Sequence, residues 1–360
     1  MSKIRLLYDH FLALGGAEKV SFELADRLND CQVETAWADE SLFAGQLNTQ
    51  QLKSFGHDYL SHFFPSLSLL WFYLVNYKVD SSYRVLATGV FSPLVLWRNK
   101  NLKRAVVYFH TFPSFINETF SQLRQAHGVV GALIFKCFSV VYLWFLRRAL
   151  KNADHVFANS NSVQQRFAAI GIDTQVLYPG VELRNLGCLA CEPYFLSTAR
   201  LESNKRIELV LQAFAELKEH KLVVVGGGSL EAQLKQHFAD CDNIEFTGWQ
   251  QEAQVKHHYN HCRALIYLPI NEYFGIAPVE AMAAGKPVIG VAEGGLLETV
   301  NDKRLGTLLP TPVDIEQVKQ TIVEYAELSN NQELIDYRQQ SAKRFEFSGF
   351  AQKLGKVLKG

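Results

Sequence analysis

Short apolar runs alternate with amphipathic segments along much of the chain. Residues 4–7 are predicted to form a first strand, and the apolar spacing that follows predicts a helix from about residue 17 to residue 28. In the second half the alternation is more regular. There we expect strands at residues 194–197, 222–225, 244–246, 264–268 and 287–290. Strands that alternate with helices in this way indicate parallel α/β sheets.

A short stretch with little periodicity separates these two halves. It begins at Tyr178-Pro179-Gly180 and runs to Glu192, and it contains the Gly and Pro residues typical of connecting segments. A chain of 360 residues is also long enough for two domains that each bury a core. We therefore expect an N-terminal domain over residues 1–180 and a C-terminal domain over residues 181–345.

One stretch is apolar enough to raise the question of a membrane. Residues 128–146 contain a single charged residue, Lys136, and approach the roughly 20 apolar residues of a membrane span. A span there would put the two parts of one domain on opposite sides of the membrane. A buried core helix or a helix lying against a membrane fits better, with Arg147, Arg148 and Lys151 flanking it. A second apolar run, residues 63–77, favours membrane contact, and we expect that contact to be peripheral, through residues 128–151.

Composition and charge restrict the class of protein. Hydrophobic residues make up 48% and charged residues 20%, which is typical of a folded globular chain, and the net charge of zero gives no reason to expect nucleic acid as a partner. Residues 1–180 hold 17 Lys and Arg against 13 Asp and Glu. That excess suits an anionic acceptor or a membrane surface, and ordinary scatter of surface charge explains it equally well.

The cysteines and the start of the chain bear on the compartment. Cys188 and Cys191 form a C-x-x-C pair, but no second pair stands at the spacing of a zinc site. The sequence opens Met-Ser-Lys-Ile-Arg without a long apolar leader. We therefore expect reduced thiols, no bound metal and a cytoplasmic protein, held peripherally on the inner face of the cytoplasmic membrane.

The most informative segment covers residues 271–290. Pro278 suits a first helical turn, where its missing N–H costs nothing. Backbone N–H groups around Phe274–Ala277 would then form an anion site at the start of that helix. Glu280, expected in the first turn, can accept two hydrogen bonds from a ribose diol, and Glu272 lies in the loop before it.

Two cations stand upstream, between a predicted strand and a predicted helix. Arg200 and Lys205 are five residues apart, a placement that suits the binding of a diphosphate. Fixed cations aimed at charge that develops on a leaving group lower the barrier to its departure. The alternative is a pair of solvated cations at the start of a helix.

The segment resembles the E-x7-E signature of glycosyltransferase family 4, whose members are retaining enzymes of the GT-B fold. In that fold two Rossmann-like domains face each other across a central cleft. Beyond Glu272 and Glu280, the similarity extends to Phe274-Gly275, to Pro278-x-Glu280-Ala281-Met282-Ala283, to 285–289 (Gly-Lys-Pro-Val-Ile), to Gly294-Gly295 and to Glu298-Thr299-Val300. The family's last helix commonly packs back on the first domain, so the resemblance implies the same for residues from about 346 to 360.

The resemblance assigns a role to each matched residue. It implies that Glu280 binds the donor ribose, that Glu272 contacts the transferred sugar, and that Arg200 and Lys205 neutralise the leaving diphosphate. It implies catalytic roles for Glu272, His110, Arg200 and Lys205. It implies that the donor is bound by Glu280, Gly15, Gly16, Gly226, Gly227, Gly248, Trp249, Phe274, Gly275, Ile276 and Asn159.

The resulting hypothesis is a retaining glycosyltransferase that needs no cofactor and no obligatory metal. Similarity to GDP-mannose-dependent mannosyltransferases favours mannose as the transferred hexose, and a saccharide or lipid-linked acceptor in the synthesis of surface polysaccharide. UDP-glucose, UDP-galactose and UDP-N-acetylglucosamine remain alternative donors. A phosphorylase or sugar-phosphate synthase on the same fold is the rival enzyme, and a nucleotide-sugar-binding scaffold is the rival without turnover.

Overall fold

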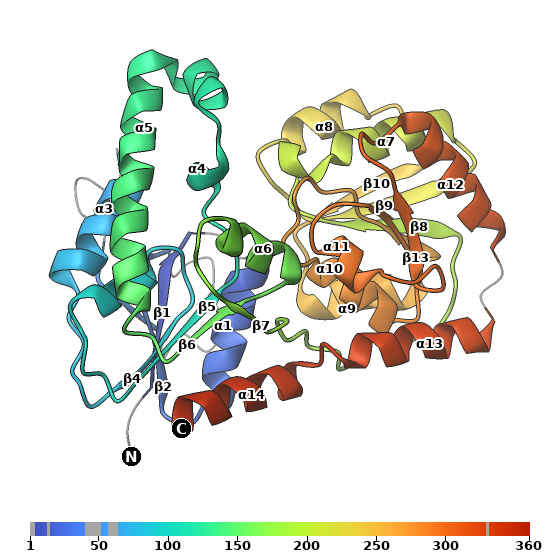
Figure 1. The fold of residues 1–360 in the computed structure, drawn as a ribbon. Coiled ribbons are helices and arrows are strands. Elements are labelled where there is room, and N and C mark those ends of the chain that lie inside the picture. The colour runs from blue at the N-terminus through green and yellow to red at the C-terminus, as the bar shows by residue number, and fades with distance from the viewer. Residues whose placement is uncertain (1–3, 13–14, 40–51, 57–63, 329–330) are drawn as a thin grey trace. The chain divides into compact units, whose positions relative to one another are not determined.

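The computed structural model describes residues 4–12, 15–39, 52–56, 64–328 and 331–360 (Figure 1). It divides the chain into two compact units. The first unit comprises Met1–Pro179 together with Phe350–Gly360, and the second comprises Gly180–Gly349. Leu14 and residue 63, which belong to segments singled out in the sequence, lie outside the described residues.

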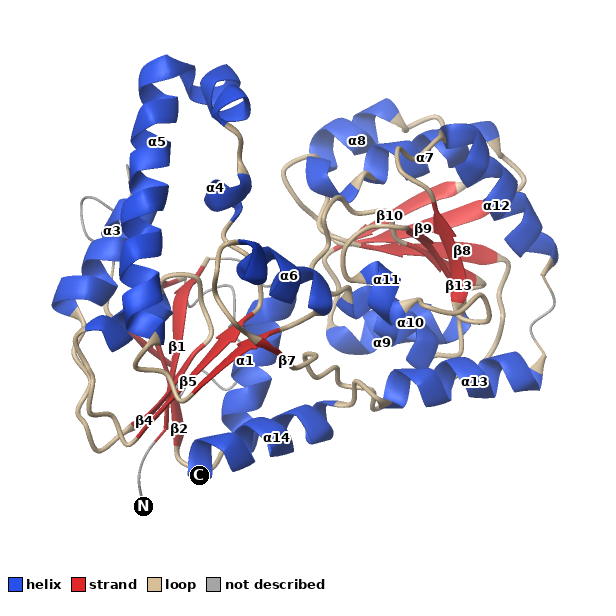
Figure 2. Cartoon of the chain, in the orientation of Figure 1, coloured by secondary structure: helices blue, strands red, loops and turns tan. Residues whose placement is uncertain are grey.

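The first unit is built on a parallel sheet. Among the described residues its strand order is β3-β2-β1-β4-β5-β6-β7. The strands are β1 (Ile4–Phe11), β2 (Cys31–Ala38), β3 (Leu52–Ser54), β4 (Arg84–Ala87), β5 (Arg104–Phe109), β6 (His155–Ala158) and β7 (Gln175–Val176). The inner strands are largely buried, and β5 is buried at every residue after Arg104, as helices on both sides of a parallel sheet require (Figure 2).

Helices connect these strands. They are α1 (Gly16–Arg27), α3 (Pro65–Trp71), the π-helical turn η3 (Phe72–Asn76), the 3₁₀ turn η4 (Ser92–Trp97), α4 (Ser114–Asn117), α5 (Phe120–Leu150) and α6 (Asn161–Ala169). The last helix, α14 (Phe347–Lys359), starts in the second unit and ends in the first. Within the first unit it packs beside α1, where Gly355 lies next to Leu28, and the ring of Phe350 lies 5.3 Å from that of Tyr108.

The second unit has a parallel sheet of order β10-β9-β8-β11-β12-β13. Its strands are β8 (Tyr194–Thr198), β9 (Lys221–Val225), β10 (Ile244–Gly248), β11 (Ala264–Ile266), β12 (Val288–Val291) and β13 (Gly306–Leu309). Its helices are η5 (Ser203–Lys205), α7 (Ile207–Glu216), α8 (Glu231–His237), α9 (Glu252–His261), α10 (Ile276–Ala283), α11 (Leu296–Thr299), α12 (Ile315–Glu327) and α13 (Gln332–Lys343). All five strands predicted for this half are confirmed, to within two residues at each end.

The strand order fixes where ligands bind. In the second sheet β8 leads outward to β9 and β10, while β11 leads the other way to β12 and β13, so the order reverses between β8 and β11. Open parallel sheets bind ligands at such a switch point, beyond the carboxyl ends of the strands. In the first sheet the corresponding point lies between β1 and β4.

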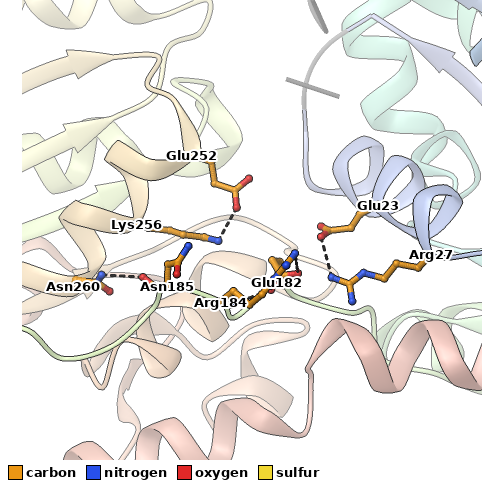
Figure 3. Close-up of polar contacts among 8 residues, drawn as sticks. All are labelled: Glu23, Arg27, Glu182, Arg184, Asn185, Glu252, Lys256 and Asn260. Carbon is orange, nitrogen blue, oxygen red and sulfur yellow. Dashed lines mark hydrogen bonds and ion pairs between the residues drawn. The ribbon is translucent and has the colours of Figure 1, made fainter. Parts of the chain in front are cut away.

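The two segments that leave the second unit run side by side within it. The Val181 N–H donates to the Phe345 carbonyl at 2.8 Å, and the Phe347 N–H donates to the Val181 carbonyl at 3.1 Å. The segment after Val181 is then held on α9, where the Asn260 side-chain amide donates to the Asn185 carbonyl at 3.0 Å (Figure 3).

Candidate active site

The switch point of the second sheet brings two predicted residues into direct contact. Lys205 follows β8 in η5, and Glu272 lies in the loop after β11. The Lys205 Nζ atom is 2.7 Å from Glu272 Oε2, and the Tyr267 hydroxyl donates to the same oxygen at 2.7 Å. Both charged side chains are largely buried, with exposed fractions of 16% for Lys205 and 19% for Glu272.

The surroundings of Glu272 decide its charge. Burial raises the pKa of its carboxyl group, but the charge and hydrogen bond of Lys205 act in the opposite direction. The hydroxyl of Tyr267 and the backbone N–H of Tyr273 add to that effect, so the net pKa is lowered. Glu272 is therefore a carboxylate at neutral pH and can accept further hydrogen bonds.

Glu280 lies on α10 and faces buried tyrosines. The helix begins at Ile276, so Pro278 lies in its first turn as expected, whereas Glu280 lies in its second turn and the expectation that it lies in the first was wrong. The Tyr259 hydroxyl is 2.6 Å from Thr198 Oγ1. Burial raises the pKa of Tyr259, and the nearby Glu280 carboxylate raises it further.

Tyr267 connects the predicted residues with one another. Burial raises the pKa of its hydroxyl, Glu272 and Glu280 raise it further, and the positive charge of Arg200 lowers it. All three side chains thus lie within electrostatic range of one phenol. Arg200 itself is exposed, and in the part of the chain that the structure describes it has no ion-pair partner. A guanidinium in that position is available to an anionic ligand.

The start of α10 offers backbone rather than side-chain groups. Gly275 has a φ of +88° and no side chain with which to cap the helix, so the first-turn amides receive no side-chain cap. The Phe274 ring is 3% exposed and packs at 5.2 Å against Phe345. Any contact of Phe274, Gly275 and Ile276 with a ligand would therefore be made by their backbone N–H groups.

A glycine pair supports the loop that carries Glu272. The Gly295 N–H donates to the Glu272 carbonyl at 2.8 Å. Gly294 has a φ of +56°, and a Cβ there would overlap the Glu272 carbonyl oxygen. Only glycine allows the backbone to approach this closely.

Some of the residues that hold the site were not assigned a role from the sequence. Arg206 donates to the Leu268 and Pro269 carbonyls at 3.3 Å and pairs with Glu293 at 2.7 Å. The second Glu293 oxygen accepts from the Asn271 N–H at 3.1 Å. The only available signal was position, since Arg206 follows Lys205 and Glu293 precedes Gly294-Gly295. For Tyr267, which lies in an apolar run, and for Tyr259, which lies in a polar helix, the sequence offers no signal.

The predicted glycine loop packs tightly on the segment after β8. The Gly226 N–H donates to the Gly248 carbonyl at 2.9 Å, and the Gly227 carbonyl accepts from the Leu201 N–H at 3.0 Å. A Cβ at Gly227 would overlap the indole of Trp249, which is 63% exposed.

From the sequence, Ser229 after the glycine loop is a possible N-cap of the next helix, but that expectation was wrong. α8 begins at Glu231 and has no side-chain cap. The Ser229 hydroxyl instead donates to Glu202 at 2.8 Å. That hydrogen bond ties the glycine loop to the segment that carries Arg200.

In the first unit, His110 and Asn159 follow the neighbouring strands β5 and β6. The Asn159 side-chain amide donates to the His110 carbonyl at 2.6 Å. The imidazole is 8% exposed and meets the rings of Tyr108 and Tyr8 edge-on. Burial lowers the pKa of His110 to about 3, so the ring is neutral near pH 7 and can exchange hydrogen bonds without carrying charge.

Gly15 and Gly16 lie at the end of β1, where α1 begins. The Gly15 N–H donates to one oxygen of Glu18 at 3.1 Å, and the Tyr8 hydroxyl donates to the other at 3.0 Å. Glu18, not singled out as a site residue in the sequence, thus fixes the glycine turn and links it to the His110 region through Tyr8.

The helix predicted over the apolar stretch is present and mostly uncovered. Within α5, Gly128–Leu150 is long and apolar enough to cross a membrane, and 22% of its most apolar window is buried within the protein. Gly128, with a φ of +72°, interrupts the helix at the start of this stretch. We call the following exposed set the apolar face of α5: Val129, Val130, Leu133, Ile134, Val140, Val141 and Trp144.

Basic and aromatic groups continue this face at the end of α5. The Arg148 guanidinium lies 3.4 Å from the centre of the Trp144 ring. Beside it, a cavity of about 400 Å³ is lined by Leu67, Leu70, Trp71, Leu74, Val75, Trp97, Arg98 and Phe145. Between Asp80 and Asp154 the sequence holds ten Lys or Arg and one acidic residue, Glu118.

Within the described ranges, no group of three or more His, Cys, Asp or Glu side chains is arranged to hold a metal ion. The two predicted sets of residues are each assembled in one unit. Arg200, Lys205, Glu272 and Glu280 meet in the second. Gly15, His110 and Asn159 are connected in the first.

Two family models match the chain. The model described as Glycosyltransferase Family 4 matches residues 14–185, and the model described as Glycosyl transferases group 1 matches residues 189–344. The alpha-1,3/1,6-mannosyltransferase of Kluyveromyces lactis is 27% identical over 81% of this chain and 70% of its own length. The alpha-monoglucosyldiacylglycerol synthase of Streptococcus pneumoniae is 27% identical over 60% of this chain and 52% of its own length.

Solved structures share the fold over the whole chain. HepE of Anabaena, solved with UDP and glucose, superposes with a TM-score of 0.72 at 19% identity and covers 100% of both chains. The sucrose-phosphate synthase of Thermosynechococcus elongatus superposes with a TM-score of 0.75 at 19% identity and covers 100% of this chain and 98% of its own. The predicted α/β class with two Rossmann-like units is thereby confirmed.

Proposed function

Because the chain belongs to the family 4, group 1 glycosyltransferases and has their GT-B fold, we propose that it transfers a hexose from a nucleotide diphosphate sugar with retention at the anomeric carbon. The best candidate is mannose from GDP-mannose, moved to a saccharide or lipid-linked acceptor in the synthesis of a surface glycan. The observation that carries this proposal is the contact of Lys205 with Glu272, beside Arg200 and Glu280, at the switch point of the second sheet.

Each part of the donor has a matching group. The hydroxyls of the ribose diol would donate hydrogen bonds to Glu280, whose carboxylate lies near the buried Tyr259. The diphosphate would be bound by Arg200, Lys205 and the uncapped backbone amides of α10. The transferred sugar would donate its hydroxyls to Glu272. The part of the site that holds the nucleoside would be lined by Gly226, Gly227, Gly248 and Trp249. In the first unit, we keep for Gly15, His110 and Asn159 the roles that the resemblance implies.

The chemistry asks little of the protein beyond positioning and charge. The bond from the anomeric carbon to the diphosphate oxygen breaks, and a new bond forms to the acceptor oxygen on the same face. The acceptor's proton passes to an oxygen of the leaving diphosphate. Arg200 and Lys205 stabilise the charge that develops there, so we propose that no metal and no protein nucleophile is required.

The donor sugar is proposed from the relatives. The K. lactis protein is named for mannosyl transfer, which supports GDP-mannose, whereas HepE was solved with UDP and glucose, so UDP-sugars are the alternatives to test. Because a sucrose-phosphate synthase has the same fold, a sugar phosphate is also tested as an acceptor.

We further propose that the enzyme works on the cytoplasmic side of a membrane, held there by residues 128–151. The apolar face of α5 supplies the buried area, and Arg148 with its neighbours supplies attraction to anionic lipid. Trp71, Trp97 and Trp144 suit the boundary between headgroups and hydrocarbon. A lipid-linked acceptor would be reached from this position, and the S. pneumoniae relative is named for a lipid product.

Calorimetric titration tests the donor assignment. Purified protein is titrated with GDP-mannose, UDP-glucose, UDP-galactose and UDP-N-acetylglucosamine, beside the variant Glu280→Ala. We expect selective binding of GDP-mannose, weakened at least tenfold in the variant because a hydrogen bond to a charged group is lost. Selective binding of a UDP-sugar would overturn the donor, and binding unchanged by the variant would overturn the role of Glu280. Release of nucleotide on addition of a sugar phosphate would favour the synthase.

A further inference from the structure

The proposed function assigns no role to Tyr267. It follows β11 directly, and its hydroxyl lies close to both charges of the site. It donates to Glu272 Oε2 at 2.7 Å, and the Lys205 Nζ atom is 3.5 Å from the phenol oxygen. The side chain is 8% exposed. Burial raises the pKa of the hydroxyl well above its usual range, so it stays protonated and remains a donor wherever the enzyme is folded.

The partners of Glu272 become unequal once a donor binds. Without a ligand, Lys205 and Tyr267 both contact the same carboxylate oxygen. In the proposed function Lys205 also serves the diphosphate, so part of its charge is directed away from Glu272. Around the Tyr267 phenol, Arg200 is directed to the same diphosphate in the proposed function, and Glu280 carries a negative charge. The hydroxyl of Tyr267 and the backbone N–H of Tyr273 also lower the pKa of Glu272, and neither group is assigned to the diphosphate.

We propose that Tyr267 is a positioning residue, whose hydroxyl keeps the Glu272 carboxylate ionised and aimed at the transferred sugar while Lys205 serves the diphosphate. This inference rests on the proposed function for its catalytic consequence but not for its physical content. A buried carboxylate that loses one of two side-chain donors takes up a proton more readily and turns more freely about its side-chain bonds. The phenol prevents both.

The first test measures the carboxylate directly. Protein labelled with ¹³C at the glutamate carboxyl group is titrated with acid by NMR, and the Glu272 signal is assigned with Glu272→Gln. Inorganic diphosphate is the probe in place of a donor. In Tyr267→Phe with diphosphate bound, we expect the midpoint for Glu272 to rise by about one pH unit relative to the wild type. An unchanged midpoint would overturn the inference, whether or not the protein proves to be a transferase.

The second test separates positioning from structure. We expect Tyr267→Phe to lower kcat by about tenfold to a hundredfold, because a hydrogen bond to a charged group is lost, while the KM for the donor changes less than about threefold. The acid limb of the pH profile should move upward with the NMR midpoint. Tyr194→Phe is the matched control, since it removes a hydroxyl that donates to the His258 carbonyl at 3.0 Å in the same unit, and it should behave as the wild type.

A double variant completes the experiment. If Tyr267 acts through Glu272, adding Tyr267→Phe to Glu272→Gln should change kcat by less than about twofold. If Tyr267→Phe instead abolishes kcat both in the wild type and in Glu272→Gln, and also lowers the free energy of unfolding, the tyrosine is merely structural. A wild type that releases no nucleotide from any nucleotide sugar would contradict the proposed function and leave the NMR result to decide on Tyr267.

Discussion

The second unit holds its functional side chains in a network of opposite charges, whereas the first unit presents an uncovered apolar helix and a neutral, buried histidine. Lys205, Glu272, Arg206 and Glu293 form two ion pairs at the carboxyl ends of the strands. In the first unit, His110 is surrounded by aromatic rings, and α5 exposes valine, leucine, isoleucine and tryptophan. A charged site can be recognised in the sequence from a few residues at a characteristic spacing. An apolar surface can be told from a buried core only once the burial of its side chains is known.

The largest effect should come from breaking the charged network. In Lys205→Ala the buried Glu272 carboxylate loses its counter-charge and the leaving diphosphate loses a cation. We expect kcat/KM for the donor to fall by about 10²–10³-fold. Lys235→Ala, which removes an exposed pair with Glu231 on α8, is the control and should stay within about twofold. An equal fall of kcat/KM in both variants would contradict a specific role for the Lys205–Glu272 ion pair.

The support beneath the network should be nearly as sensitive. Gly294→Ala forces a side chain into the left-handed region and against the Glu272 carbonyl. We expect the free energy of unfolding to fall by about 2–4 kcal/mol in urea denaturation. Gly349→Ala, where a Cβ meets nothing within 4 Å on α14, should be neutral or slightly stabilising. Equal stability of the two variants would contradict the close approach at Gly294.

The apolar face of α5 provides the third test. In Val130→Asp combined with Ile134→Asp, two exposed apolar side chains become charges of the same sign as anionic lipid. We expect binding to sedimented phosphatidylglycerol vesicles to weaken by about tenfold to a hundredfold. Val323→Asp, at an exposed valine on α12 of the second unit, should bind as the wild type. Binding that is equal in all three proteins would remove α5 from the membrane proposal.

The smallest effect concerns the neutral histidine. Burial lowers the pKa of His110 to about 3, whereas histidine in an unfolded chain titrates near ~6.5. Below that pH the unfolded chain binds a proton that the folded chain does not, so stability falls as the pH falls from about 6.5 toward 3. Between pH 7 and 5 this contributes a loss of up to about 2 kcal/mol.

The comparison that checks this is urea denaturation at both pH values. His110→Asn should lose less stability than the wild type over the interval, because it has no imidazole to protonate. His237→Asn, which changes an exposed histidine on α8, should keep the wild-type dependence. A wild-type dependence in His110→Asn would show that this imidazole titrates in the folded protein much as it does in the unfolded chain, which would contradict the lowered pKa.

The sequence predicted all strands described in the second unit except β13, and it placed Glu272 and Lys205 in one donor site. It did not predict the contact between them, which arises because residues at the carboxyl ends of parallel strands converge at one edge. It did not predict Tyr267 or Tyr259, since neither the apolar run around Tyr267 nor the polar helix around Tyr259 indicates whether a tyrosine hydroxyl is used. Ser229 was misplaced because a carboxylate 27 residues away competes for its hydroxyl. Glu18 was missed because only folding brings Tyr8 and Gly15 to opposite oxygens of one side chain.

The path of the chain through the two units has a consequence for biosynthesis. Since the first unit is made of Met1–Pro179 and Phe350–Gly360, its final segment emerges from the ribosome only after all of Gly180–Gly349. The second unit is continuous and can reach its native contacts while the first still lacks α14 beside α1. The second unit should therefore fold without the last segment of the chain, and a truncated protein that ends at Gly349 should resist protease in the second unit more than in the first.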